Sequence, residues 1–348
     1  MYDFVIVGAG LTGSICAYEL HKKGYKVIII EKRNHIGGNC YTEKWLNDID
    51  IHIYGPHIFF TNEKKIWDYM NHFDTFVPFI NNVKAEYEDK EYTLPFNLTT
   101  IQEVYGENKH INISNKEYEN IEDYAINELG EELYEILIKG YTEKQWGLKC
   151  NEIPPEIIKR IPIRMNYDDN YYDAKYQGIP LNGYTHIFNE MLRDVPIILN
   201  TNFKNIEKEI HYTNLIYTGS IDEFYDYCYG VLPYRSLDFA HTIRNGTYQT
   251  TAVRNYTKFE IPYTRSIEHK HFLNKKNSQT VVSFEFPSNF DNANERFYPI
   301  NTKINNTLYK KYYSLKTPQT YFLGRLGAYK YLNMSDAIKE AIAFCKKF

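Results

Sequence analysis

The first forty residues constrain the fold more than any other stretch of the chain. Residues 2–7 (YDFVIV) are apolar and rich in β-branched and aromatic side chains, which is typical of a buried parallel strand. GAGLTG follows at residues 8–13, then a stretch with helical periodicity, then a second apolar run at residues 26–30 that ends at Glu31. A strand, G-x-G-x-x-G, a helix, a strand and an acid in this order predict a dinucleotide-binding βαβ unit.

Each residue of this motif has a physical task. Gly8 permits a tight turn, Gly10 lets the backbone approach a pyrophosphate, and Gly13 lets the helix pack closely on the strand. The start of the helix offers free N–H groups and the positive end of its dipole to the phosphates. Glu31 can accept hydrogen bonds from both hydroxyls of an adenosine ribose. The alternative is a glycine-rich turn without a ligand, and the complete context favours the dinucleotide.

The residues after Glu31 separate a flavin from a nicotinamide cofactor. Residues 31–39 (EKRNHIGGN) contain a second glycine pair, Gly37 and Gly38, which lets the backbone pass close to a large ligand. A plain NAD site has no need of this pair. The run resembles the extended fingerprint of the FAD-binding amine-oxidase-like superfamily, in which such a pair lies against the cofactor.

Composition excludes several classes of function. A chain of 348 residues allows two or three domains, and a formal net charge of −4 gives no reason to expect nucleic acid or an anionic membrane as partner. No apolar run is long enough to span a bilayer, and the chain enters a strand at residue 2, so we expect no signal peptide and a cytoplasmic protein. The 5 cysteines are scattered without C-x-x-C spacing, which predicts reduced thiols and no metal site.

The periodicity along the chain predicts an α/β fold with two insertions. Residues 83–94 read as a hairpin, residues 120–139 as a helix capped by Asn120, residues 247–254 and 280–287 as strands, and the last helix as capped by Ser335. We expect an FAD-binding Rossmann-like domain built from residues 1–75, 200–240 and 315–348. A helical lobe is expected over residues 96–162, and an antiparallel β-sheet substrate domain over residues 76–95, 163–199 and 241–314.

Several ordered blocks resemble the UDP-galactopyranose mutase family. They are residues 54–59 (YGPHIF), 140–147 (GYTEKQWG), 159–162 (KRIP), 176–180 (YQGIP), 262–265 (PYTR), 268–272 (EHKHF), 324–326 (GRL) and 329–331 (YKY). The resemblance therefore extends over nearly the whole chain.

The resemblance implies a known reaction. The family converts a UDP-galactopyranose to the furanose form with reduced FAD and without net redox change. The flavin N5 is thought to attack the anomeric carbon with UDP as the leaving group, which is covalent catalysis by a cofactor. It further implies a reductant such as NAD(P)H or a reductase, a homodimer, and a place in polysaccharide biosynthesis.

The resemblance also implies roles for single residues. Arg160 and Arg265 match two arginines that clamp the substrate diphosphate, and His57 matches a histidine beside the flavin. The expected substrate-binding residues are Phe60, Tyr141, Thr142, Trp146, Tyr171, Asn255, Tyr298 and Tyr331. The expected FAD-binding residues are Gly8, Gly10, Thr12, Gly13, Glu31, Lys32, Gly38, Asn39, His57, Thr218, Gly219, Arg325 and Leu326. Taken singly, each arginine could be a surface charge, and each tyrosine or His57 an ordinary core residue.

Two departures from the family pattern leave the sugar open. Phe60 replaces a histidine, and Asn333 replaces an aspartate. Another UDP-sugar, such as an arabinose, a deoxy sugar or an N-acetylgalactosamine, is therefore an alternative substrate. An amine-oxidase-like oxidoreductase on the same fold and a non-catalytic nucleotide-binding protein are competing readings. The diphosphate clamp favours the mutase, because an amine substrate would need no such clamp.

Overall fold

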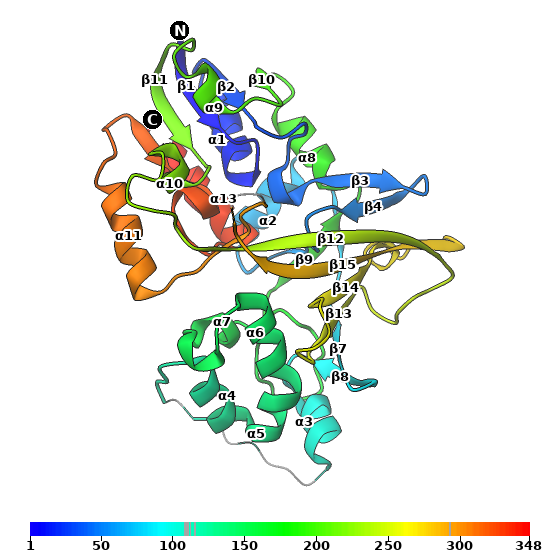
Figure 1. The fold of residues 1–348 in the computed structure, drawn as a ribbon. Helices are drawn as coiled ribbons and strands as arrows, with labels where there is room; N and C mark the ends of the chain where they lie inside the picture. The colour runs from blue at the N-terminus through cyan, green and yellow to red at the C-terminus, as the bar shows by residue number, and fades with distance from the viewer. Residues whose placement is uncertain (108–110, 112, 115, 292–293) are drawn as a thin grey trace.

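A computed structural model describes residues 1–107, 111, 113–114, 116–291 and 294–348. The residues outside this description fall within the expected helical lobe and the expected sheet domain. In Figure 1 a parallel sheet with its helices lies at the upper end of the molecule, a helical lobe lies at the lower end, and a long twisted sheet lies between them.

The parallel sheet confirms the expected βαβ start of the chain. Its strand order is β10-β2-β1-β11-β17, and every neighbouring pair is parallel. The strands are β1 (Tyr2–Val7), β2 (Val27–Ile30), β10 (Ile197–Ile198), β11 (Tyr212–Tyr217) and β17 (Thr320–Phe322). Because both faces are covered, neighbouring side chains of β1 enter different cores: Phe4 and Ile6 enter one, and Val5 enters the other.

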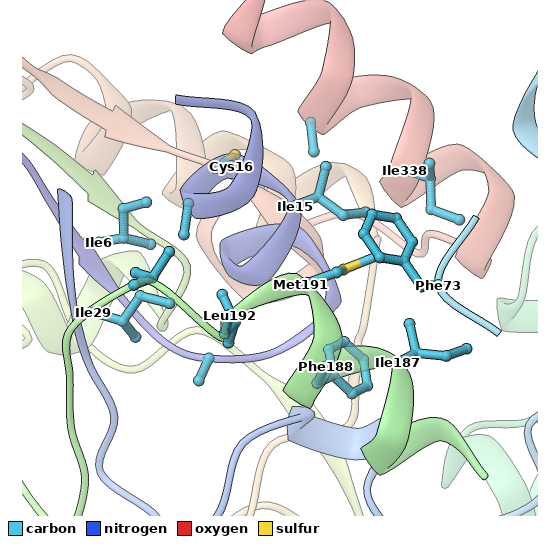
Figure 2. Packing of buried hydrophobic residues seen from close by; sticks show 14 of the residues in the cluster. Ile6, Ile15, Cys16, Ile29, Phe73, Ile187, Phe188, Met191, Leu192 and Ile338 are labelled. Carbon is cyan, nitrogen blue, oxygen red and sulfur yellow. The ribbon is translucent and has the colours of Figure 1, made fainter. Parts of the chain in front are cut away.

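Three helices cover one face of this sheet. They are α1 (Leu11–Lys22), α8 (Tyr184–Met191) and α13 (Met334–Cys345). Figure 2 shows Ile15 of α1, Ile338 of α13 and Phe188 of α8 within one buried cluster, with Ile6 and Ile29 of the sheet beside them. The other face carries α9 (Phe203–Ile206), α10 (Ile221–Phe224) and α11 (Lys303–Tyr313).

The middle layer is a seven-stranded sheet with the order β16-β12-β15-β14-β13-β7-β8. Its strands are β7 (Val83–Tyr87), β8 (Lys90–Leu94), β12 (Tyr234–Asn245), β13 (Val253–Tyr256), β14 (Arg265–Glu268), β15 (Gln279–Asn289) and β16 (Tyr298–Pro299). The sheet is antiparallel except at β13 and β7, which are parallel. A parallel pair needs a long crossover, and here the helical lobe lies in that crossover.

The helical lobe contains α3 (Leu98–Tyr105), α4 (Ile121–Leu129), α5 (Glu131–Leu133), η2 (Tyr134–Lys139), α6 (Gly140–Trp146), η3 (Cys150–Glu152) and α7 (Glu156–Lys159). Asn120 caps α4 as predicted, because its side chain accepts from Asp123 N. The single helix predicted over residues 120–139 is wrong. The chain bends at Gly130, where φ is +93°, and continues as a π-helix over Tyr134–Lys139.

Smaller elements connect these layers. β3 (Thr42–Trp45) and β4 (Ile49–His52) form a hairpin, and β5 (Phe59–Thr61), β9 (Tyr176–Pro180) and β6 (Phe76–Pro78) form a three-stranded sheet. The remaining elements are η1 (Gly38–Cys40), α2 (Lys64–Asn71), η4 (His269–His271) and α12 (Gly324–Gly327).

Two further predictions differ from the structure. Asn333, not Ser335, caps α13, because its side chain accepts from Asp336 N while the Ser335 hydroxyl bonds Thr61. The predicted strand over residues 247–254 begins only at Val253. The backbone amides of Tyr248 and Gln249 donate to the buried Glu268 carboxylate and not to a carbonyl of a neighbouring strand.

Sheet membership differs from the expected domain limits at two places. β10 pairs with β2, and α8 packs into the core of the parallel sheet, although both fall within the range 163–199 expected for the other domain. β12 begins at Tyr234 and pairs with β15, although residues 234–240 were expected in the nucleotide domain. At both places, pairing between strands that are distant in the sequence determines which sheet a segment joins. β10 has only two residues, which is too short for a periodic pattern to be seen in the sequence.

Candidate active site

A deep cavity opens at the carboxyl ends of the parallel strands. It is lined by most of the residues predicted to bind the cofactor: Gly8, Gly10, Thr12, Glu31, Lys32, Gly38, Asn39, His57, Thr218, Gly219, Arg325 and Leu326. Gly13 is the exception, since it packs α1 onto the sheet. A Cβ at Gly13 would lie 2.0 Å from Gly8 O. That placement agrees with the packing task predicted for the third glycine.

The floor of this cavity is bare backbone. Gly8 has a φ of +101°, and a Cβ there would lie 2.2 Å from Thr218 Oγ1. Gly38 has a φ of +54°, and its Cβ would lie 2.8 Å from Gly10 Cα. Gly37 N donates to Ala9 O at 2.8 Å, so the two glycine segments lie side by side. Only residues without side chains let these backbones approach both each other and a ligand.

Glu31 lies at the end of β2, in the wall of the cavity. Its Oε2 accepts from Ala9 N at 2.6 Å and its Oε1 from Arg33 N at 2.8 Å, and the residue is 6% exposed. The two backbone donors fix the orientation of the carboxylate. Each oxygen keeps a further lone pair for a ligand in the cavity.

His57 lines the same cavity and is held in one tautomer. Its Nδ1 lies 2.8 Å from Gly55 O, and a carbonyl only accepts, so Nδ1 carries the proton. Burial lowers the pKa of His57 to about 4, and the nearby Arg325 and Arg265 guanidiniums act in the same direction. The imidazole is therefore neutral at pH 7, with Nε2 as an acceptor.

A second cavity lies between the helical lobe and the seven-stranded sheet. Nine of the predicted substrate residues line it: Tyr141, Thr142, Trp146, Arg160, Tyr171, Asn255, Arg265, Tyr298 and Tyr331. Most come from α6, from the end of α7, and from β13, β14 and β16, whereas Tyr171 lies between α7 and β9 and Tyr331 between α12 and α13. The remainder of the lining is largely apolar, with Phe96, Leu137 and Ile161 among its residues.

Arg265 is the more constrained of the two arginines. It begins β14, its Nη2 donates to Tyr141 Oη at 2.9 Å, and its Nε lies 3.3 Å from Glu285 Oε1. Glu285 is 1% exposed, and this burial raises the pKa of its carboxyl even though Arg265 opposes the shift. The guanidinium is thereby fixed at one edge and keeps other N–H groups for a ligand.

Arg160 follows α7 at the mouth of this cavity and is more exposed. Its Nη1 donates to Tyr331 Oη at 2.6 Å, and its Nε donates to Ile157 O at 3.0 Å. Burial raises the pKa of Tyr331, but the guanidiniums of Arg160, Arg325 and Arg265 outweigh this effect and lower it. The phenol is therefore a stronger hydrogen-bond donor than an ordinary tyrosine.

The two cavities meet at Arg325. This residue lines the first cavity, and its Cζ lies 5.3 Å from the ring centre of Tyr298 and 5.4 Å from that of Tyr331, which line the second. Its guanidinium donates to Leu332 O at 2.8 Å and to Phe297 O at 3.3 Å. The arginine thus forms part of a shared wall.

Phe60 lies outside the lining of both cavities. It points away from the core that holds Phe59 and stacks on Tyr172, with ring centres 4.1 Å apart and planes at 16°. Tyr172 follows Tyr171, which does line the second cavity. The structure therefore puts Phe60 behind Tyr172, and neither of these two rings lines that cavity.

Sequence reasoning missed several lining or supporting residues. Glu285 had a detectable signal, since it is a lone carboxylate in the apolar run 280–287. Gln145 lines the second cavity, and its buried Oε1 has no hydrogen-bond partner among the described residues. Thr201, Phe203 and Glu295 line the first cavity, but they lie far from any glycine motif and carried no local signal.

Two family models match this chain. A family model described as UDP-galactopyranose mutase matches residues 136–331, and one described as an NAD(P)-binding Rossmann-like domain matches residues 6–73. The first spans more than half of the chain. No helix within the described part of the chain is long and apolar enough to cross a membrane.

Curated relatives are similar over the whole length. The chain is 39% identical to a "Probable UDP-galactopyranose mutase" of Klebsiella pneumoniae, over 99% of this chain and 94% of that protein. It is 37% identical to a dTDP-fucopyranose mutase of Escherichia coli, over 98% and 97%. It is 35% identical to a UDP-galactopyranose mutase of Mycoplasma genitalium, over 98% and 93%.

The fold is also that of a solved relative. A crystal structure of reduced UDP-galactopyranose mutase superposes with a TM-score of 0.78 at 16% identity, covering 99% of this chain and 93% of that one. The whole-length similarity to named mutases and the family match over the second cavity lead to one conclusion: the chain is an isomerase that belongs to the UDP-galactopyranose mutase family.

Proposed function

We propose that this protein interconverts the pyranose and furanose forms of a UDP-sugar with the help of reduced FAD. The observation that carries the proposal is the second cavity, in which Arg160 and Arg265 lie with hydrogen-bonded tyrosines beside a dinucleotide cavity. Paired guanidiniums match the charge and geometry of a diphosphate.

The residues of the first cavity suit FAD. The backbone of Gly8, Gly10 and Gly38 lines this cavity without side chains, as close approach of a pyrophosphate requires. Glu31, already oriented by two backbone amides, is available to the ribose hydroxyls. The cavity then continues to His57 and Arg325, which leaves room for a ligand longer than a mononucleotide.

The main task of the chain's own residues would be to stabilise the negative charge that develops on the leaving diphosphate. Reduced FAD, when bound, supplies the nucleophile for the anomeric carbon. The bond from that carbon to the diphosphate oxygen breaks with both electrons on the oxygen. Arg160 and Arg265 then stabilise the anion that leaves, and Tyr331, with its lowered pKa, donates a strong hydrogen bond to it. Neutral His57 can accept a proton or a hydrogen bond at Nε2.

The identity of the preferred sugar depends on the residues near the second cavity. Relatives are named for UDP-galactopyranose and for dTDP-fucopyranose, and fucose lacks the hydroxyl on C6. The stacked pair Phe60 and Tyr172 offers an apolar surface behind the second cavity. This favours an analogue of galactose with fewer polar substituents, such as a deoxy sugar, over an N-acetyl sugar. A reductant such as NAD(P)H or a reductase, and a homodimer, complete the proposal by analogy with the family.

An amine-oxidase-like oxidoreductase is the second candidate. Its support is the fold, since a structure described as a putative protoporphyrinogen oxidase from Exiguobacterium superposes with a TM-score of 0.65 at 12% identity. Fold alone does not decide function, and the arginine pair favours the mutase.

Purified protein incubated with UDP-galactose and dithionite, followed by chromatography, tests the proposal. We expect a yellow protein with non-covalent FAD, and a furanose product without net oxidation. A colourless protein that takes up no added FAD would contradict the cofactor. A yellow protein that leaves UDP-galactose, UDP-arabinose, UDP-fucose and dTDP-fucose unchanged but oxidises amines would favour the second candidate.

A further inference from the structure

Lys144 lies in a cage of main-chain carbonyls. Its Nζ donates to the carbonyl oxygens of Tyr256 at 2.8 Å, Lys258 at 2.8 Å, Ile261 at 2.9 Å and Tyr263 at 3.0 Å. The residue is 8% exposed, and no carboxylate of the described residues forms an ion pair with it. An ammonium has three protons, so these four acceptors use its entire donor capacity.

The cage is made by Tyr256, the last residue of β13, and by the loop of residues 257–264, which joins β13 to β14. This loop ends directly before Arg265, the first residue of β14. It is closed by Tyr256 N donating to Thr264 O at 2.8 Å and tied to β7 by Thr257 N donating to Glu86 O at 3.0 Å. Four carbonyl oxygens that converge on one point repel each other unless a cation lies between them.

α6 rests on this loop along one face. Gly140 and Lys144 are four residues apart and so lie on the same side of the helix. A Cβ at Gly140 would lie 2.3 Å from Thr257 O, which means that the helix backbone directly contacts the loop. Tyr141, Thr142 and Gln145 line the second cavity from other sides of the helix.

The carboxyl end of α6 is held separately. Arg235 is 4% exposed, and it donates to Gln145 O at 2.8 Å and to Lys144 O at 2.9 Å. Lys144 is therefore the charged link specifically between α6 and the loop that leads to Arg265, whereas Arg235 links α6 to β12.

We infer that Lys144 is a positioning residue that locks α6 onto the 257–264 loop and so sets Tyr141 at hydrogen-bond distance from Arg265. The 2.9 Å bond between Tyr141 Oη and Arg265 Nη2 spans these two elements. A shift of either element would move the guanidinium that the proposed function assigns to the diphosphate. The inference rests on that proposed function, and it touches the substrate only through Tyr141 and Arg265.

The charge state of the cage gives an independent readout. Burial lowers the pKa of Lys144 to about 8, opposed by the carboxylates of Glu260 on the loop and Glu86 on β7. Tyr256 and Tyr263, whose carbonyls form the cage, have phenol pKa values raised by burial, and Lys258 directs its own ammonium to Glu88. Above pH 8 a neutral amine would leave at least two of the four carbonyls without a proton.

The first experiment is a double-mutant cycle. Lys144→Met keeps the length of the side chain and removes its donors, and Lys139→Met is the matched control, an exposed lysine five residues earlier whose ion pair is with Glu135. We expect Lys144→Met to lower kcat/KM at least tenfold and raise KM, with the visible FAD spectrum unchanged, while Lys139→Met stays within twofold of the wild type.

In a Tyr141→Phe background the same Lys144→Met substitution should cost less than threefold. An equal loss in both backgrounds would show that Lys144 acts independently of Tyr141 and would overturn the inference, as would an unchanged Lys144→Met enzyme. If neither wild type nor Lys139→Met turns over any nucleotide sugar, the proposed function fails. Amide hydrogen exchange then tests the positioning role without reference to activity.

Amide hydrogen exchange on the wild type covers the case in which Lys144→Met does not fold. After correction for intrinsic rates, protection of residues 256–264 should fall at least tenfold between pH 7 and pH 9, while protection of β12 and β15 stays constant. Unchanged protection of residues 256–264 over this range would overturn the inference without reference to activity.

Discussion

At the scale of single residues, Arg265 carries the largest share of the proposed chemistry. One well-placed donor to a developing anion contributes about 2.7–4 kcal/mol to the transition state, a factor of about 100 to 1000 in rate. We expect Arg265→Ala to lose turnover by this factor while FAD stays bound, since Arg265 does not line the first cavity. Steady-state kinetics and the visible spectrum measure both quantities.

Arg265→Ala has a second consequence, because it leaves the buried Glu285 carboxylate without its partner. Adding Glu285→Gln should restore thermal stability but not turnover, which separates the two effects. Arg244→Ala, at an exposed arginine over the ring of Tyr248, is the control and should keep full activity. Wild-type rates in Arg265→Ala would remove the arginine from the clamp.

Phe60 is the residue on which the sugar preference is expected to depend. An aromatic ring offers no hydrogen bond to a sugar hydroxyl, and a buried hydroxyl without a partner costs about 1–3 kcal/mol. We expect Phe60→His to raise kcat/KM for UDP-galactose relative to UDP-fucose by roughly tenfold. Specificity constants for UDP-galactose, UDP-N-acetylgalactosamine, UDP-arabinose and UDP-fucose test this.

The alternative is that the Phe60 ring only packs against Tyr172 and has no effect on sugar preference. Phe60 stacks on Tyr172 behind the second cavity, so a purely structural role predicts equal losses for all four sugars. Phe60→Leu is the matched variant, since it also loses the stack but gains no hydrogen bond. If UDP-galactose is the best substrate of the wild type and Phe60→His gains nothing with it, the specificity role is wrong.

At the scale of elements, the contact between the β1–α1 turn and the Gly37–Gly38 segment defines the first cavity. Gly38→Ala would place a Cβ 2.8 Å from Gly10 Cα and so force the two backbones apart. We expect this variant to lose FAD affinity at least tenfold, as measured by flavin fluorescence during titration.

Gly24→Ala is the control for backbone strain alone. Gly24 also has a positive φ, +92°, but a Cβ there would meet nothing within 4 Å among the described residues. It should lower thermal stability by about 1 kcal/mol, the usual cost of a positive φ, and leave FAD affinity unchanged. Equal FAD affinity in both variants would mean that the close contact does not shape the cofactor site.

Local motifs allowed the first cavity to be predicted, because consecutive residues build its floor. The turn of residues 8–13, the acid at the end of β2 and the second glycine pair lie within forty residues. The second cavity needed a family resemblance, since its residues come from α6, β13, β14, β16 and the segments after α7 and α12, and no local pattern joins them.

Long-range pairing explains the features that were missed. β10 is only two residues long and is defined by its pairing with β2, and Glu285 matters through its ion pair with Arg265. The carbonyl cage of Lys144 depends on how the 257–264 loop folds back. In the sequence Lys144 is simply a polar residue in a short helix.

At the scale of the whole molecule, buried and partly buried histidines link the first cavity to the seven-stranded sheet. His57 N donates to His52 Nδ1 at 3.0 Å, and His52 N donates to His269 Nδ1 at 3.3 Å. His269 Nε2 lies 2.6 Å from Ser283 Oγ, which lies 2.6 Å from His241 Nδ1. Two of these rings must keep an unprotonated Nδ1 to accept a backbone N–H, so protonation would break the series.

Burial also keeps these rings neutral. It lowers the pKa of His269 to about 3 and of His57 to about 4, and that of His52 well below its usual value of 6.5. In the unfolded chain the same histidines bind a proton near pH 6.5. Between about pH 4 and 6.5 the unfolded state therefore binds more protons than the folded state, so the free energy of unfolding rises with pH in this window. His271, whose pKa Glu268 raises, opposes the trend, and so do the carboxyls of Glu285 and Asp50, whose pKa values burial raises.

The stability of the protein should therefore be full above pH 6.5 and fall as the pH drops toward 4, by about 1.4 kcal/mol per pH unit for each histidine that stays neutral. Urea unfolding at pH 7.5 and pH 5.0 measures the slope. His52→Asn removes one titrating group while an amide oxygen can still accept from His57 N, so its slope should be smaller by about one histidine. The exposed His72→Asn should keep the wild-type slope, because its ring remains solvated in both states. A slope for His52→Asn equal to that of the wild type would mean that acid sensitivity arises outside this series.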